Sequence, residues 1–191
     1  MESKKLNPVQ IILLVTQLMS ERRFDELGDL ARQDERVLNH LVQTLRDGRG
    51  PFCFFAATGL SKAGESAVEP LLEALQDGQY VVRQVAALAL GEIGDLRAVE
   101  GLVAGLEDEH EAVRQAVAVS LGKLGAVEAI EPLLQVIRDE SEIVRRAVVN
   151  ALGMIGDERA LPELKRVEAE DTEAVAERAR GVIGEIGERE E

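Results

Sequence analysis

The stretch Val82–Gly94, VRQVAALALGEIG, recurs twice downstream, as VRQAVAVSLGKLG at Val113–Gly125 and as VRRAVVNALGMIG at Val144–Gly156. Each copy begins 31 residues after the one before it. The apolar residues in each copy follow the three- and four-residue spacing of an amphipathic helix. Each copy ends in a glycine that suits a left-handed helix C-cap. A repeat of this length is typical of stacked helical units.

The same period orders the core positions over a longer part of the chain. One column holds Leu71, Leu102, Leu133 and Leu164, and others hold Val82, Val113, Val144 and Val175, then Leu90, Leu121, Leu152 and Ile183. Each unit predicts two helices of about 12–13 residues joined by a polar turn such as 138–141. Helices this short are stable only when neighbouring units bury their apolar faces. We therefore expect an all-α fold, a right-handed α-α superhelix of helical hairpins.

The two ends of the chain differ from its middle. Residues 1–33 lack the columns but carry Asn7-Pro8, a helix-capping pair, and predict an N-terminal capping pair of helices. Residues 34–63 fit as a divergent unit at a spacing of 30, and 64–187 hold four units of period about 31. The last unit is predicted to be a cap because Ala176 replaces an arginine column and its helices carry more charge. Residues 188–191 form a charged tail.

Composition and charge narrow the classes of function. Apolar residues make up 46% of the chain and aromatic residues 3%, which suits aliphatic helices better than a sheet sandwich. The lone Cys53 permits no internal disulfide, and the apolar run 11–19 is shorter than a membrane span. Residues 1–63 carry a net charge of +1 and 64–191 carry −15. We therefore expect a cytoplasmic protein that binds neither nucleic acid nor membranes.

The pattern Val-Arg-x-x-(Ala/Val)-x-x-(Ala/Ser)-Leu-Gly-x-(Ile/Leu)-Gly at 82–94, 113–125 and 144–156 resembles the short HEAT-like repeats of phycobilisome bilin lyases. The resemblance covers 64–187 well and 34–63 loosely. It implies a solenoid of HEAT-like hairpins whose second helices line the concave side. It does not fix the function, because this family includes scaffolds, lyase subunits and a metal enzyme.

A charged pattern recurs in step with the core. An acidic residue precedes each column valine by five positions, at Asp77, Asp108, Asp139 and Glu170, and an arginine follows it at Arg83, Arg114 and Arg145. As the family resemblance implies, we interpret these residues as a structural Asp–Arg ladder across the turns within each repeat, which satisfies turn amides and aligns successive units. The alternative is a charged surface that recognises a ligand.

The sequence predicts no catalytic, cofactor or metal residue. His110-Glu111 is similar to the His-Glu pairs of iron-binding deoxyhypusine hydroxylases, but that family's positions hold Gln84-Val85, Gln115-Ala116 and Arg146-Ala147 here. His110 instead shares its column with Ser141 and Thr172, which are natural N-cap residues. We expect Cys53 to be a buried structural thiol, because a thiolate nucleophile needs a neighbouring base or cation and the only histidine near it in sequence is His40.

The candidate site is a stripe on the second helices, the positions that remain once the core columns are removed. Its small and uncharged character predicts an apolar groove for a partner helix or an extended segment, although the stripe could equally be covered within the chain. One of the phenylalanines at 52, 54 and 55, most plausibly Phe54, should face the surface. The predicted contact residues are Phe54, Ala57, Thr58, Gln84, Ala87, Leu88, Gln115, Ala118, Val119, Arg146, Val149 and Asn150, with Gly91, Gly122 and Gly153 beside them.

These features favour a scaffold or adaptor that binds another protein, and a basic rim on that partner would match the acidic half of the chain at 64–191. The first alternative is a catalytic or non-catalytic subunit of a bilin lyase-like enzyme, as the family resemblance implies. A HEAT-like nucleic-acid-binding protein is the weaker alternative, because such proteins need a basic groove.

Overall fold

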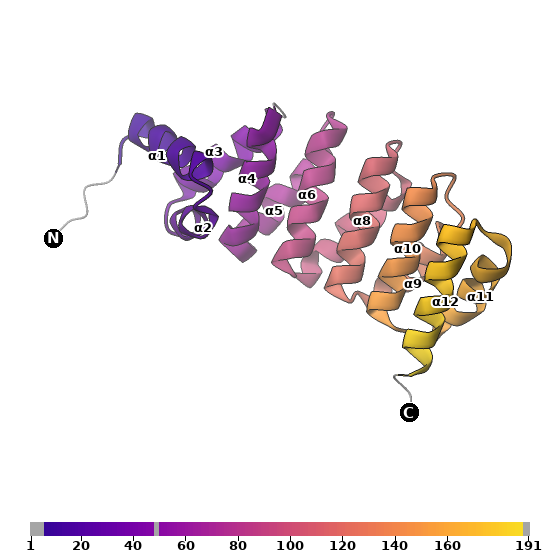
Figure 1. Ribbon diagram of the computed structural model, residues 1–191. Helices are drawn as coiled ribbons and strands as arrows, with labels where there is room; N and C mark the ends of the chain where they lie inside the picture. Colours follow the sequence, from indigo (N-terminus) through magenta and orange to yellow (C-terminus); the bar gives the residue numbers. More distant parts are fainter. Residues whose placement is uncertain (1–5, 48–49, 189–191) are drawn as a thin grey trace. The chain divides into compact units, whose positions relative to one another are not determined.

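The computed structural model describes residues 6–47 and 50–188, and the secondary structure of these residues is entirely helical (Figure 1). The all-α fold predicted from the repeat is confirmed. The chain divides into two compact units, unit 1 up to Ile93 and unit 2 from Gly94. The division falls after the first of the four repeats at 64–187. Of the charged tail, only Glu188 lies within the described residues.

Unit 1 is a stack of helical hairpins. Its elements are α1 (Pro8–Ser20), α2 (Phe24–Gln33), α3 (Glu35–Arg46), α4 (Gly50–Ala63), the 3-10 turn η1 (Gly64–Ala67), α5 (Val68–Ala74) and α6 (Tyr80–Ile93). Helix α1 begins with a capping box. The side-chain oxygen of Asn7 accepts a hydrogen bond from the backbone N–H of Gln10, and the side-chain oxygen of Gln10 accepts one from the backbone N–H of Asn7. Helix α2 packs against α4, and α4 packs against α6. The second helices therefore form one continuous layer within the unit.

Unit 2 repeats this arrangement three times. Its elements are η2 (Leu96–Ala98), α7 (Val99–Ala104), η3 (Gly105–Glu107), α8 (Glu111–Leu124), η4 (Val127–Ala129), α9 (Ile130–Gln135), α10 (Glu142–Ile155), η5 (Glu158–Ala160), α11 (Leu161–Glu170) and α12 (Glu173–Gly187). The second helices α8, α10 and α12 lie side by side, with the first helices behind them in Figure 1. None of the helices among the described residues is both long and apolar enough to cross a membrane.

The first helices are shorter than the sequence predicts. In the repeats from residue 64 onward, α5, α7 and α9 have six or seven residues, and only α11 reaches ten. The 3-10 turn that precedes each one takes up the missing length. In η2 and η5 an aspartate fixes this turn, because Asp95 and Asp157 accept a hydrogen bond from the backbone N–H two residues later, at 2.9 Å. The second helices α6, α8 and α10 have 14 residues, close to the expected length.

The predicted core columns are buried. The four leucines of the first-helix column and the four valines of the second-helix column are at most 1% exposed. Leu121 and Leu152 are equally buried, whereas Ile183, their counterpart in α12, is half-buried. This loss of cover in α12 agrees with a terminal repeat that has no further second helix on its outer flank within the described residues.

Glycines allow neighbouring second helices to approach closely. A Cβ atom on Gly122 would lie 2.7 Å from the Cα atom of Ala151, and one on Gly153 would lie 2.8 Å from a methyl group of Val182. Gly184 occupies the same column in α12, and apart from the adjoining backbone of its own helix no described atom lies within 4 Å of its Cβ position. The later glycine of the motif ends its helix in the left-handed conformation, with φ of 60° at Gly125 and 75° at Gly156.

This difference predicts opposite effects of one substitution at two equivalent positions. Gly122→Ala should destabilise the protein although alanine favours helix, because the new methyl group meets the backbone of α10. Gly184→Ala should stabilise it by about 0.5–1 kcal/mol, the helix-propensity gain without a clash. Urea unfolding of both variants measures the two free energies. Equal effects at both sites would contradict the close approach.

Candidate partner-binding surface

The second-helix face of unit 1 contains an apolar groove between α4 and α6. Its volume is about 330 Å³. Phe54, Thr58 and Leu88 line it, and Lys62 and Glu92 contribute from the C-terminal turns of the two helices. Phe54 is 48% exposed, so its ring is accessible from solvent. An accessible aromatic ring beside a half-buried leucine can bind an apolar side chain of a partner.

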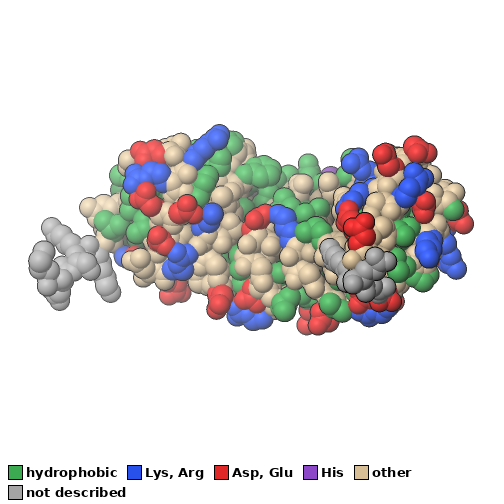
Figure 2. All heavy atoms as spheres, turned by 60° about the horizontal axis from the view of Figure 1, so that its bottom comes forward, with side chains coloured by type: hydrophobic (Ala, Val, Ile, Leu, Met, Phe, Trp, Pro, Cys, Tyr) green, Lys and Arg blue, Asp and Glu red, His purple; other side chains and the backbone are tan. Residues whose placement is uncertain are grey.

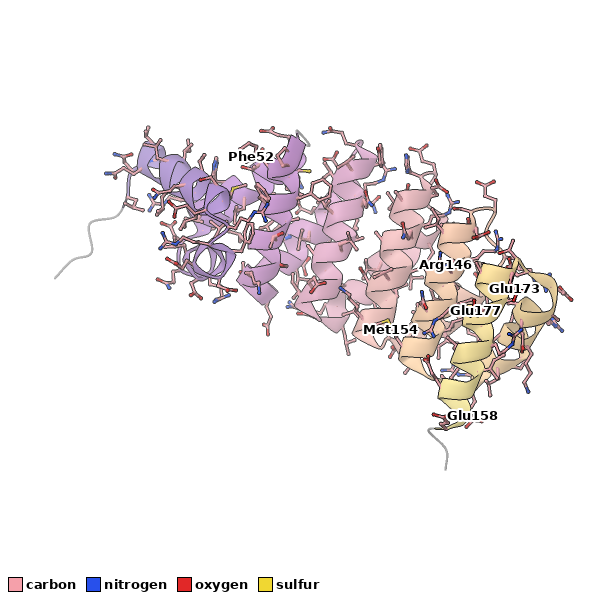
Figure 3. All side chains as sticks on the ribbon, in the orientation of Figure 1. Phe52, Arg146, Met154, Glu158, Glu173 and Glu177 are labelled. Carbon is pink, nitrogen blue, oxygen red and sulfur yellow. The ribbon has the colours of Figure 1, made fainter. Side chains whose placement is uncertain are left out.

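The second-helix face of unit 2 is centred on α10. Ile143, Arg146, Asn150 and Met154 follow one another along the outward side of this helix, and the first, second and fourth are exposed. Arg146 and Met154 lie on the same face as Glu173 and Glu177 of α12 (Figure 3). On α8, the corresponding Gln115 and Val119 are half-buried. This surface therefore combines exposed apolar, cationic and acidic side chains.

Three residues of the predicted stripe do not belong to this surface, because Ala87, Ala118 and Val149 are fully buried. Ala57 is only 6% exposed, but it lines the groove between α4 and α6 beside Phe54. Each second helix is covered not only by its own first helix but also along its flanks by other second helices, so the buried arc is wider than the core columns alone indicate. Gly91, Gly122 and Gly153 are buried for the same reason. Only one position per turn remains open, as at Gln84 and Leu88.

The remaining predicted residues lie at the surface with different surroundings. Gln84, Leu88, Gln115, Val119 and Thr58 are half-buried, and Phe54 and Arg146 are exposed. Asn150 is engaged within the chain, because its side-chain oxygen accepts a hydrogen bond from Nε of Arg178 in α12. A partner that used Asn150 would therefore also meet Arg178.

The structure adds large exposed side chains that the sequence analysis did not select. Phe52 is 45% exposed and packs edge-on against Phe55, at 6.1 Å between ring centroids, while Phe55 lies 5.8 Å from Phe24 of α2. Ile143 and Met154 are about half exposed. Ile143 and Met154 continue the spacing of Arg146 and Asn150 by one turn at each end, and this spacing is the signal that could have identified them.

The Asp–Arg ladder consists of two-pronged bonds between neighbouring repeats. Nε and Nη2 of Arg114 donate to the two carboxylate oxygens of Asp139, at 2.7 and 2.9 Å. Nη1 of Arg114 donates to the backbone oxygen of Asp108 in its own turn, at 2.9 Å. Arg145 repeats the pattern with Asp171 and the Asp139 backbone. The sequence predicts these pairs within a repeat, but each arginine side chain bonds the carboxylate of the next repeat and only the backbone of its own turn. In the last turn this carboxylate belongs to Asp171 instead of Glu170, because α11 runs to Glu170.

Each ladder aspartate also caps its own turn. Asp77, Asp108 and Asp139 accept from the backbone N–H two residues later, at 2.8–2.9 Å, and Nη1 of Arg83 donates to the Asp77 backbone oxygen at 2.9 Å. Burial alone would raise the pKa of Asp139, but the hydrogen bonds from Arg114 and the Ser141 amide, with the charges of Arg114 and Arg145, hold it below its ordinary value. This geometry favours the structural interpretation of the charged columns.

The polar residues at the N-termini of the second helices are also used within the chain. His110 is the N-cap of α8, where its Nδ1 accepts from the Ala112 amide at 3.4 Å. The hydroxyl groups of Ser141 and Thr172 each donate to a glutamate of the preceding repeat, Glu111 and Glu142. Many further charged side chains pair at the surface, and acidic and basic groups are interspersed on the face in Figure 2.

The described residues supply no obvious catalytic centre. Among them, no group of three or more His, Cys, Asp or Glu side chains is arranged to hold a metal ion. Cys53 is buried, as predicted, and its burial raises the pKa of the thiol. A thiol in this state is a poor nucleophile.

These features define a helical-repeat protein whose second helices carry exposed apolar side chains in each unit. Residues 38–110, 68–142 and 99–184 match the family model of HEAT repeats, and the chain belongs to this family. The chain is also similar to a solved structure, a chain in the complex of CpcE and CpcF of phycocyanin lyase from Nostoc sp. PCC7120. That chain is 26% identical, with a TM-score of 0.72 over 78% of this chain and 99% of that one.

Two further comparisons extend this relationship. The phycocyanobilin lyase subunit alpha of Picosynechococcus sp. is 39% identical over 79 residues, a match that covers 37% of this chain and 30% of that protein. A designed armadillo repeat protein in complex with the peptide (KR)4 is similar in fold, with a TM-score of 0.57 and 19% identity over 87% of this chain and 92% of that one. The repeats are thus of the type found in bilin lyase subunits.

The ladder predicts an acid-sensitive stability. Because the pKa of folded Asp139 lies below the unfolded value near 3.9, the pair stabilises the fold above that pH and loses its effect as the pH falls through the lowered pKa. Asp139→Asn should cost about 3 kcal/mol at neutral pH, since it leaves Arg114 largely buried without its carboxylate. The unfolding free energy of this variant should also fall less steeply as the pH is lowered through the acid range.

The matched control is Asp157→Asn, which alters an exposed pair with Arg159 and keeps a side chain that can cap. Its cost should stay below about 1 kcal/mol. Urea titrations between pH 3 and pH 7, as approximate limits around the carboxylate range, measure both variants. A similar cost for the two would refute the ladder as a source of stability.

Proposed function

We propose that this chain is a protein-binding scaffold or adaptor, a HEAT-repeat subunit that associates with another protein through its second-helix faces. The observation that carries the proposal is the similarity to a chain of the CpcE–CpcF complex over 99% of that chain's length, because that relative acts in association with a second protein. The exposed groove of unit 1 and the exposed face of α10 in unit 2 are the surfaces that such a partner would cover.

The chemistry of the two faces indicates what kind of partner they would accept. In unit 1, Phe54 and Leu88 line an apolar groove. Aromatic residues in such pockets contribute much of the binding energy at protein interfaces. Unit 2 has 12 basic and 23 acidic residues, a net charge of −11, against −3 in unit 1. A partner with apolar anchors and a basic rim would therefore associate faster and more specifically than an acidic one.

A pair of substitutions, one in each unit, tests the proposed surfaces. Leu88→Asp combined with Val119→Asp places a charge on each second-helix face and should reduce capture of the partner at least about tenfold, because a carboxylate would be buried in an apolar contact. Affinity capture from the source lysate, followed by mass spectrometry, measures the loss.

The matched control is Leu96→Asp with Val127→Asp. These side chains are of the same types and are exposed, but they lie in the 3-10 turns between repeats. This variant should capture the partner as the unmodified chain does. Circular dichroism and melting of both variants verify the fold. Undiminished capture by the folded Leu88/Val119 variant would reject the second-helix faces as the binding surface.

A second candidate function is a bilin lyase subunit, which the 39% identity to phycocyanobilin lyase subunit alpha favours. On this hypothesis the chain would act with a second subunit on a bilin or a bilin-bearing protein. Mixing the purified chain with a free bilin and following the visible spectrum tests it. A stoichiometric spectral change would support the lyase-related role, and an unchanged spectrum would leave the scaffold as the better account.

A further inference from the structure

Helix α1 has an outward apolar face that the described residues leave exposed. Leu13 is 65% exposed, Val9 64% and Ile12 47%, although all three are large aliphatic residues. They lie on one side of the helix, because their spacing of three and four residues brings them together. The opposite side, with Ile11, Val15, Leu18 and Met19, is buried in unit 1. The exposed face is therefore additional to the side that anchors the helix.

This face differs from the other exposed apolar residues of the protein. Single exposed leucines are ordinary on protein surfaces, and Leu96 is one, but three neighbours on one helix face form a patch. The 13 residues of α1 include no Asp, Glu, Lys or Arg. A surface helix normally carries its charges on the solvent side, as α2 does with Asp25, Glu26 and Arg32. The outward side of α1 lacks this feature.

Electrostatics indicate which partner suits the patch. The chain carries a net charge of −14, so two copies repel each other over most of their surface. Residues 1–63, however, hold 9 basic and 8 acidic side chains, and α1 itself holds none of either. Two copies can therefore approach at α1 without like-charge opposition. A strongly charged partner would gain no complementarity from this face.

We infer that α1 pairs with α1 of a second copy of this chain, forming a two-fold symmetric dimer. In an antiparallel pair, Ile12 and Leu13 would lie near the two-fold axis, and Val9 of one copy would face Thr16 of the other. In the antiparallel arrangement the positive N-terminus of each helix dipole also lies beside the negative C-terminus of the other, which is favourable. This interaction is independent of the second-helix faces, which remain open to another partner.

The size of the contact sets its strength. A helix of 13 residues is about 20 Å long, so one helix pair buries less than the roughly 800 Å² per partner of a standard interface. We therefore expect an equilibrium between monomer and dimer that depends on protein concentration. A permanent dimer would require a larger contact.

Sedimentation velocity of the full chain across the micromolar concentration range tests the inference. The unmodified chain should shift from monomer to dimer as its concentration rises. Leu13→Glu should raise the dimer dissociation constant at least about tenfold, because it places a charge near the axis on each copy. Leu96→Glu is the matched control, since Leu96 is 62% exposed and lies outside α1, and it should dimerise as the unmodified chain does.

Disulfide trapping tests the antiparallel register. Leu13→Cys should form a covalent dimer on mild oxidation, whereas Leu96→Cys should not, and the native Cys53 is buried and out of reach. A chain that stays monomeric throughout, or a Leu13→Glu variant that dimerises normally, would overturn the proposal. An open series of larger oligomers would also overturn it, because that outcome indicates a head-to-tail contact. Binding of the monomer to lipid vesicles that is lost in Leu13→Glu would assign the face to a membrane instead.

Discussion

The close approach of neighbouring second helices is the constraint on which the other features of this protein depend. Gly122 and Gly153 permit it, because any side chain at these positions would meet the next helix. Short helices that are unstable alone gain their stability from such contacts, repeat by repeat. The same contacts bury both flanks of α10 and leave one narrow strip of it open to solvent, whereas α12 keeps one flank open within the described residues. The strip, and not the whole outer half of the helix, is what a partner can contact.

The turns at the N-terminal ends of the second helices are joined by a different interaction. Arg114 and Arg145 bond the carboxylate of the next repeat and the backbone of their own turn, so that each guanidinium joins two repeats. Because the pairing is two-pronged, it fixes the orientation of successive repeats as well as their distance. In the last repeat Ala176 takes the arginine position, and the ladder does not extend beyond it in the described residues. The charge of the repeats is thus partly structural, and the exposed remainder is available to a partner.

The repeat columns predicted the core correctly, because a residue that recurs every 31 positions in a stack faces the same neighbours each time. Leu71, Leu121 and Val144 illustrate this. The columns could not reveal how far neighbours cover the flanks of a helix, so Ala87, Ala118 and Val149 were assigned to the surface although they are buried. The columns also did not predict that Asp171, which follows α11, bonds Arg145. A fixed period of 31 residues cannot show that one helix is longer by one residue. The stripe pattern also selects Phe54 and Leu88, and both line the groove between α4 and α6.

Native-state hydrogen exchange measures directly how far the second helices of unit 2 cover one another on their flanks. The amide hydrogens of fully covered helices exchange only when the whole unit unfolds, whereas those of helices with an open flank exchange through local unfolding. The amides of α8 and α10 should therefore be the slowest in unit 2 and should share one opening free energy, while those in the C-terminal half of α12 exchange faster. Exchange in α8 and α10 as fast as in the end of α12 would contradict the account.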